Sequence, residues 1–174
     1  MRWAPGAVIQ VWIEPAALPL HAGELVAKAM SAWTEAASGR VVLRRTLPGG
    51  RRDIRVRFVQ SDTNFGETAP RVDRRTGQIV SADVAINRDV AASDELTERI
   101  AVYLTALHEL GHALGLPHTD DFRTIMYRFR RPDDGERYFA AYRSRLRSAD
   151  DIGTPAATGL SPDDVRALRE LYDR

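Results

Sequence analysis

The sequence predicts an α+β fold, in which a twisted mixed β-sheet carries two long helices and is followed by a small irregular C-terminal part that ends in a helix. In the first two thirds of the chain, segments in which apolar and polar residues alternate as in strands follow segments with helical periodicity. The last third is mostly irregular. With 174 residues, 44% of them hydrophobic, the chain has the size and composition of one domain with one core. We therefore expect a single domain over residues 1–174, with an N-terminal subdomain at 1–115 and a C-terminal subdomain at 116–174.

The beginning of the chain alternates between strand and helix patterns. Ala7–Glu14 alternates apolar and polar residues and is followed by helical spacing over Gly23–Ala37, where apolar residues recur every three or four positions. That helix should lie across the sheet. Val41–Arg45 and Ile54–Val59 are short β-branched segments and predict two further strands.

The middle of the chain contains the strongest helical signal. Ser61–Gln78 is rich in Thr, Asp, Gly and Pro, which indicates a long connection with a short strand near Glu67–Val72. Apolar and polar residues alternate again over Ile79–Asn87, which predicts another strand. Apolar residues at helical spacing then run from Leu96 to Leu114, with Asp94 as the expected N-cap.

The C-terminal third should be irregular except for two helices. Residues Arg123–Thr158 contain one expected short helix around Glu136–Leu146. The final helix should begin at Ser161-Pro162-Asp163-Asp164, which combines a hydroxyl cap, a proline in the first turn and acidic residues at the positive end of the helix dipole. Four apolar residues would dock it: Val165, Leu168, Leu171 and Tyr172.

The composition excludes several classes of function. The net charge of +1 gives no support to binding of nucleic acid, and the chain has no apolar run long enough to span a bilayer. Because it has no cysteine, it can have neither disulfides nor a thiolate metal site. The first six residues do not resemble a secretory signal. We expect a monomer with no nucleic-acid partner and no membrane span.

Three of the four histidines fall within eleven residues, and their spacing predicts a metal site. His108 and His112 are four residues apart on the expected helix, so their imidazoles face one point. Gly115 lets the chain turn so that His118 can return as a third ligand. Three neutral nitrogens on Zn²⁺ leave one tetrahedral position open, as catalytic sites require, and Glu109 is placed to act as a base on a water at that position.

The segment His108–His118 matches the H-E-x-x-H-x-x-G-x-x-H motif of the metzincin zinc endopeptidases in full. Ile125-Met126-Tyr127 resembles the methionine turn that lies beneath the metal in this clan. Thr119 and Asp121 follow the third histidine as in the matrixins, so the chain is most similar to the simpler microbial matrixin-like peptidases.

This resemblance implies a metzincin-like zincin fold and a zinc-dependent endopeptidase. It implies one catalytic Zn²⁺ held by His108, His112 and His118, with Glu109 as general base and then general acid. It also implies a protein or peptide substrate, and relatives of this kind are usually exported, which favours an extracellular or periplasmic location.

In the family, substrate binds as an extended strand along an exposed edge of the sheet. Glu67–Val72 is the favoured segment for this edge and Ile79–Asn87 is the alternative. Matrixins carry a proline after Met-Tyr that forms a wall of the specificity pocket, and Arg128 replaces it here. The final helix resembles the C-terminal segment of the matrixins, and this resemblance implies that Asp163 and Asp164 anchor the chain beneath the active site.

Eight arginines crowd the segment that should form the specificity loop, and they raise an alternative function. They could steer acidic substrates, bind an anionic surface or simply be solvated. The alternative to an enzyme is a catalytically inactive zinc-containing protein that uses this segment to bind an anionic partner; the presence of Glu109 argues against it. The arginines are Arg123, Arg128, Arg130, Arg131, Arg137, Arg143, Arg145 and Arg147.

The remaining acidic, histidine and tryptophan residues form no recognisable ligand site in the sequence. Calcium is possible but unsupported, since Asp83, Asp89 and Asp94 are scattered along the sequence. A second, structural zinc is not expected, because His21 is the one histidine outside the motif. The three tryptophans should be core or rim residues rather than a ligand cage: Trp3, Trp12 and Trp33.

Overall fold

A computed structural model describes residues 1–16, 18–19, 21–47, 49–61, 64–89 and 94–173. Within them the chain forms a five-stranded sheet, four α-helices and two short 3-10 turns at Ala149–Asp151 and Pro155–Ala157. No helix in these ranges is both long and apolar enough to cross a bilayer. The elements are β1 (Ala7–Ile13), α1 (Ala22–Ala37), β2 (Val41–Arg45), β3 (Ile54–Val59), β4 (Gly66–Val72), β5 (Ile79–Asn87), α2 (Glu95–Ala113), α3 (Asp134–Arg143) and α4 (Pro162–Asp173).

The sheet is mixed, as the sequence predicted, and its strand order is β2-β1-β3-β5-β4. β2, β1, β3 and β5 run parallel to one another, and β4 pairs antiparallel with β5. The short strand expected near Glu67–Val72 is therefore β4, at one edge of the sheet. The alternative edge, Ile79–Asn87, was wrong, because this segment is β5 and hydrogen-bonds on both sides, to β3 and to β4.

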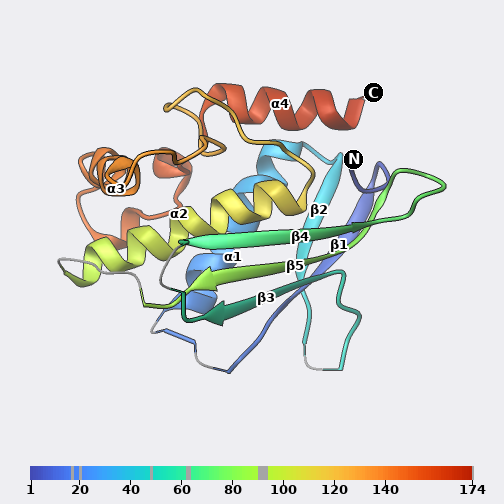
Figure 1. Ribbon diagram of the computed structural model, residues 1–174, viewed down its shortest axis with the longest axis horizontal. Coiled ribbons are helices and arrows are strands. Elements are labelled where there is room, and N and C mark those ends of the chain that lie inside the picture. Colours follow the sequence, from blue (N-terminus) through green and yellow to red (C-terminus); the bar gives the residue numbers. More distant parts are fainter. Residues whose placement is uncertain (17, 20, 48, 62–63, 90–93, 174) are drawn as a thin grey trace.

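The two long helices pack on each other and on the sheet, and their contact forms the centre of the core. Trp33 of α1 is fully buried, and its Nε1 donates to the carbonyl oxygen of Leu107 in α2 at 2.7 Å. Trp3 is also buried and donates to Ala113 O at 2.8 Å. Trp12 is a rim residue, with the guanidinium of Arg52 stacked 3.9 Å from its ring centroid. In Figure 1, α2 lies between β4 on one side and the C-terminal part with α3 and α4 on the other.

Both expected ends of α2 are confirmed. The carboxylate of Asp94 accepts a hydrogen bond from Thr97 N at 2.9 Å, so Asp94 is the N-cap. After the helix, Gly115 has φ +104°, a conformation that side chains rarely adopt. A Cβ at this position would also collide with the carbonyl oxygen of Met1. The chain can thus turn at residue 115 only because it is glycine.

The C-terminal part contains both expected helices, but α3 differs in its bounds. It begins at Asp134 and ends at Arg143, whereas the sequence predicted Glu136–Leu146. The earlier start follows from Asp134, whose buried carboxylate accepts from the backbone N–H groups of Arg130 and Arg131, each at 3.0 Å. These bonds tie the preceding loop to the first turn of the helix.

The final helix is anchored through one of the two aspartates. Asp164 is 2% exposed, and its Oδ2 accepts from Ile125 N at 3.0 Å and from Ser161 N at 2.8 Å. The Ser161 hydroxyl in turn accepts from Asp164 N at 3.1 Å, which confirms the expected cap. The expectation for Asp163 was wrong, because its side chain is 42% exposed and pairs with Arg166 on the surface of the helix.

We predict that Asp164→Ala lowers the free energy of unfolding by about 3 kcal/mol, because two backbone N–H groups lose their acceptor and a buried donor without one costs roughly 1–3 kcal/mol. Asp163→Ala is the matched control and should lower it by less than about 1 kcal/mol. Urea unfolding followed by tryptophan fluorescence measures both. Equal losses in the two variants would contradict the anchoring role.

Candidate metal centre and active site

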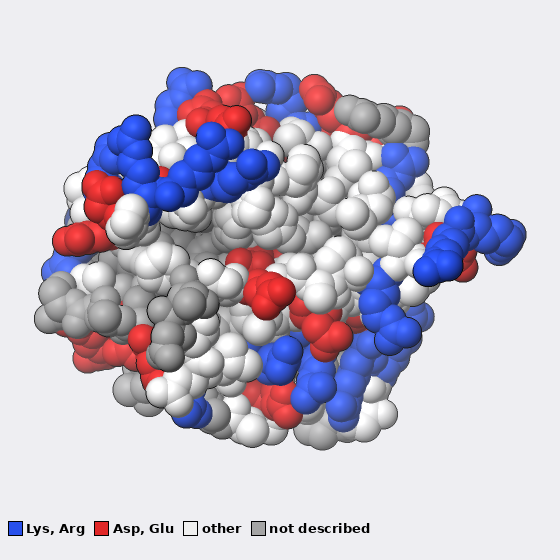
Figure 2. Space-filling view, in the orientation of Figure 1, with Lys and Arg blue, Asp and Glu red and all other residues white. Residues whose placement is uncertain are grey.

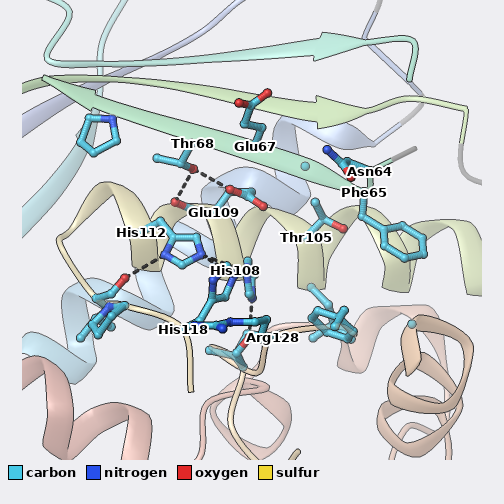
Figure 3. A pocket seen from close by; sticks show the side chains of 18 of the residues that line it. Asn64, Phe65, Glu67, Thr68, Thr105, His108, Glu109, His112, His118 and Arg128 are labelled. Atoms are coloured by element: carbon cyan, nitrogen blue, oxygen red, sulfur yellow. Dashed lines mark hydrogen bonds between the residues drawn. The ribbon is translucent and has the colours of Figure 1, made fainter. Parts of the chain in front are cut away.

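Three histidine side chains converge at the C-terminal end of α2. His108 and His112 stand one turn apart on the helix, and His118 returns toward them after the turn at Gly115. Their Nε2 atoms are 3.1 Å apart for His108 and His112, 3.0 Å for His112 and His118, and 3.2 Å for His108 and His118. Among the residues that the structure describes, no other group of three potential donor side chains is so close together. Figure 3 shows the three rings at the floor of a pocket.

Backbone carbonyls fix the tautomers of the two helical histidines. The Nδ1–H of His108 donates to Ile125 O at 2.6 Å, and that of His112 donates to Leu116 O at 2.8 Å. A neutral imidazole that donates through Nδ1 has a bare lone pair at Nε2. Two such lone pairs 3.1 Å apart repel each other unless a cation lies between them.

The spacing of the three nitrogens fits a tetrahedral ion. Two nitrogens at about 2.0–2.1 Å from one Zn²⁺ are about 3.3 Å apart at the tetrahedral angle, close to the observed 3.0–3.2 Å. Burial also favours the neutral, ligating form of the rings. It lowers the pKa of His108 to about 3, and it lowers the pKa values of His112 and His118. The residues present could thus hold a zinc ion.

Glu109 lies beside the histidines and is 5% exposed. Burial raises the pKa of its carboxyl group to about 7, opposed by a hydrogen bond from Thr68 and reinforced by the negative charge of Glu67. Thr68 lies on β4, and its hydroxyl donates to Oε2 of Glu109 at 2.6 Å. Figure 3 shows Thr68 and Glu109 together above the histidine rings.

A glycine on β4 makes room for this carboxylate. A Cβ at Gly66 would lie 2.7 Å from Cγ and 2.8 Å from Oε1 of Glu109, too close for any side chain. Neither Gly66 nor Thr68 was predicted from the sequence to belong to the site. Both contacts span about forty residues and depend on how β4 lies against α2, and no local pattern reveals that.

The expected methionine turn passes beneath the histidines. It is closed by hydrogen bonds from Thr119 N to Met126 O at 2.8 Å and from Arg128 N to Thr119 O at 2.9 Å. Met126 is 2% exposed and packs against Gly111, the residue directly before His112. The turn also supplies the Ile125 carbonyl that orients His108, so it supports the centre by packing and by backbone geometry.

A cavity of about 800 Å³ opens beside the histidines, and Figure 2 shows the hollow on this face of the molecule. One part of its lining is apolar and aromatic, and Phe65 meets Phe139 there edge to face at 5.2 Å. Charged side chains stand on its walls, with Glu67 on the β4 side. The apolar lining includes Phe65, Leu104, Ile125, Phe129, Pro132 and Phe139.

The other candidate ligands from the sequence lie elsewhere. Asp94 caps α2, Asp83 is inside β5, and Asp89 lies near the Arg88 side chain at 3.7 Å, so these three acids form no common site. His21 is the N-cap residue of α1 and takes no part in the histidine cluster.

Comparison with known proteins agrees with this geometry. The sequence profile of the family described as Matrixin matches residues 18–173, nearly the whole chain, including β4, α2, all three clustered histidines and the methionine turn. Among curated proteins, no match is found.

We predict that Gly111→Ala destabilises the protein by about 1–3 kcal/mol, although alanine is normally the better helix former by about 1 kcal/mol. A Cβ at this position would collide with Sδ of Met126 and lie 3.0 Å from the Trp33 ring. Thermal unfolding measures the change. In the double variant Gly111→Ala, Met126→Ala the collision is removed, so the added effect of the alanine at 111 should become small. A stability gain from Gly111→Ala alone would contradict this packing.

Proposed function

The chain belongs to the matrixin family, whose members are peptidases, and we propose that it is a zinc-dependent endopeptidase acting on proteins or peptides. In this proposal His108, His112 and His118 hold one catalytic Zn²⁺, and Glu109 is the general base and then the general acid. The observation that carries it is the set of three Nε2 atoms within 3.2 Å of one another, two of them with bare lone pairs, at the floor of an open cavity.

Zinc, when bound, would polarise the scissile carbonyl and lower the pKa of a water toward 7. The protein's own contribution is to hold and move a proton at Glu109. A carboxyl group whose pKa lies near neutral can take a proton from the attacking water and return it to the departing amine. Thr68 would hold Oε2, leaving Oε1 as the oxygen that exchanges the proton.

The free edge of β4 supports binding of an extended substrate. Asn87 N donates to Phe65 O at 2.7 Å, and antiparallel pairing alternates from there. The backbone groups of Gly66, Thr68 and Pro70 therefore point away from β5, toward the cleft side. Proline has no N–H to donate and occurs at such outward positions. A peptide could thus add a strand to β4 opposite Gly66 and Thr68, next to Glu109.

The apolar part of the cavity would receive a substrate side chain next to the cleaved bond. It is lined by Phe129 and Phe139 and begins at His108, whose ring lies 5.7 Å from that of Phe129. We infer that the protein prefers a large apolar residue at this position, since such a side chain would be removed from water there.

We predict that Glu109→Gln keeps its zinc and loses hydrolysis of unstructured casein by about 10²–10⁴-fold, the usual contribution of a positioned general base. Glu98→Gln, at the other end of α2, makes the same chemical change and should leave the rate unaltered. Metal analysis and casein cleavage on the same preparations measure both quantities.

A chelator should abolish cleavage, and added zinc should restore it, with one zinc ion per chain. Zinc-loaded wild-type protein that cuts neither casein nor a peptide library would overturn the proposed function. Unchanged turnover in Glu109→Gln would overturn the role given to Glu109 alone.

We also predict that Thr68→Val lowers kcat about tenfold with little change in KM. The variant keeps the shape of the side chain but removes the hydrogen bond to Glu109, and a bond to a charged group contributes roughly 1.5–3 kcal/mol. Thr68→Ser keeps the hydroxyl and should retain most of the activity. Steady-state kinetics on a defined peptide tests this, and a loss of equal size in Thr68→Ser would reject the positioning role.

A further inference from the structure

The arginine-rich segment does not present its positive charge uniformly. Six of its eight arginines are engaged by neighbouring side chains, mostly at the surface. These contacts are Arg123–Asp121 at 2.7 Å, Arg130–Asp120 at 2.7 Å, Arg143–Asp94 at 2.6 Å, Arg147–Asp151 at 3.7 Å, Arg137–Asp134 at 3.8 Å and Arg145 over the Tyr142 ring at 5.3 Å.

The two that remain, Arg128 and Arg131, line the cavity beside the histidines. Neither forms an ion pair with an acid in the described part of the chain, and both side chains are exposed. Arg128 is close enough to His118 for its charge to help lower the pKa of that ring. In Figure 3 it lies across the histidine cluster from Glu109 and Thr68.

The opposite wall of the cleft has the opposite charge. Glu67 is exposed on β4 and also lines the cavity. Figure 2 shows Lys and Arg side chains along the upper edge of the hollow and acidic side chains directly below it. An extended peptide in this cleft would therefore meet negative charge at Glu67 and positive charge at Arg128 and Arg131.

We propose that Arg128 and Arg131 select substrates that carry an acidic side chain close to the cleaved bond, on the face of the peptide that is turned toward these two arginines. The inference rests on the proposed endopeptidase function and specifies its substrate class. A guanidinium group binds a carboxylate through paired hydrogen bonds, which the uncharged amide of glutamine reproduces only in part. Because the six other arginines are already engaged, the selection acts on what enters the cleft and not on the surface as a whole.

The geometry also limits which substrate positions can be read. Side chains of an extended chain alternate between its two sides, so residues two apart face the same wall. The acidic residue should therefore lie two positions before or after the residue that fills the apolar part of the cavity. A glutamate one position away would lie on the face that carries Glu67 and should not be favoured.

The test uses peptides with one fixed apolar residue and either Glu or Gln at each of the two positions on either side of it. For wild-type protein we expect at least one position where Glu raises kcat/KM about tenfold over Gln, and this preference should shrink in high salt because exposed charges are screened. Arg128→Gln and Arg131→Gln should each weaken the preference, and the double variant should reduce it to within twofold.

The matched control is Arg130→Gln, which removes the same charge from the same loop at a residue that pairs with Asp120 and does not line the cavity. It should keep the full preference. Arg128→Glu should reverse it, so that Lys is favoured over Gln at the same position. Equal cleavage of Glu and Gln peptides at all positions, or a preference that survives in the double variant, would overturn the inference while leaving the endopeptidase function intact.

Binding separates the two proposals. Fluorescence polarisation of the same labelled peptides with zinc-loaded Glu109→Gln protein should show the same charge preference without turnover. If wild-type protein cleaves nothing but binding still depends on Arg128 and Arg131, the endopeptidase proposal fails and the charge selection stands. If binding is independent of the peptide's charge, the inference fails whatever the activity.

Discussion

The site depends on the mutual approach of three imidazole nitrogens, two of which carry no proton. Two backbone carbonyls enforce this arrangement, since Ile125 O and Leu116 O each accept the Nδ1 proton of a histidine and leave its Nε2 bare. Both carbonyls belong to the chain after α2, so the two histidines on the helix are oriented only once that chain has turned back. Gly115 permits the first turn, and Asp164 holds the second by binding Ile125 N.

The helix that carries His108 and His112 is also at the centre of the core. α2 packs on α1, and the Trp33 side chain donates a hydrogen bond to the Leu107 carbonyl oxygen. Gly111, directly before His112 on the same helix, packs against Met126 and the Trp33 ring. Packing and chemistry are therefore coupled. The burial that stabilises the fold also keeps the histidines neutral and raises the pKa of Glu109. A divalent cation beside Glu109 would favour the ionised carboxylate, so metal binding and loss of its proton should accompany each other.

Structural features that depend on residues close in sequence could be predicted, whereas contacts that depend on how distant segments pack against each other could not. The histidine spacing, the Asp94 cap and the turn at Gly115 involve residues close in sequence, and the structure contains all three elements. Thr68 and Gly66 meet Glu109 across about forty residues, and nothing in their local sequence marks them. The same reason explains the wrong expectation for β5, because alternation identifies a strand but not its place in the sheet. It also explains why only one of the two adjacent aspartates anchors α4: they point in different directions from the helix, and only Asp164 faces the methionine turn.

The two walls of the cleft differ in the kind of recognition they can provide. β4 offers backbone groups and a glycine that brings the strand close to Glu109, which suits any extended peptide whatever its sequence. The wall after the methionine turn offers rings and two arginine side chains, which depend on the substrate's side chains. If both walls bind substrate as proposed, general affinity and selectivity reside in separate segments of the chain. The side chains of Arg128 and Arg131 are exposed and form no ion pair within the described part of the chain, so selectivity could change at these positions without disturbing the carbonyls that orient the histidines.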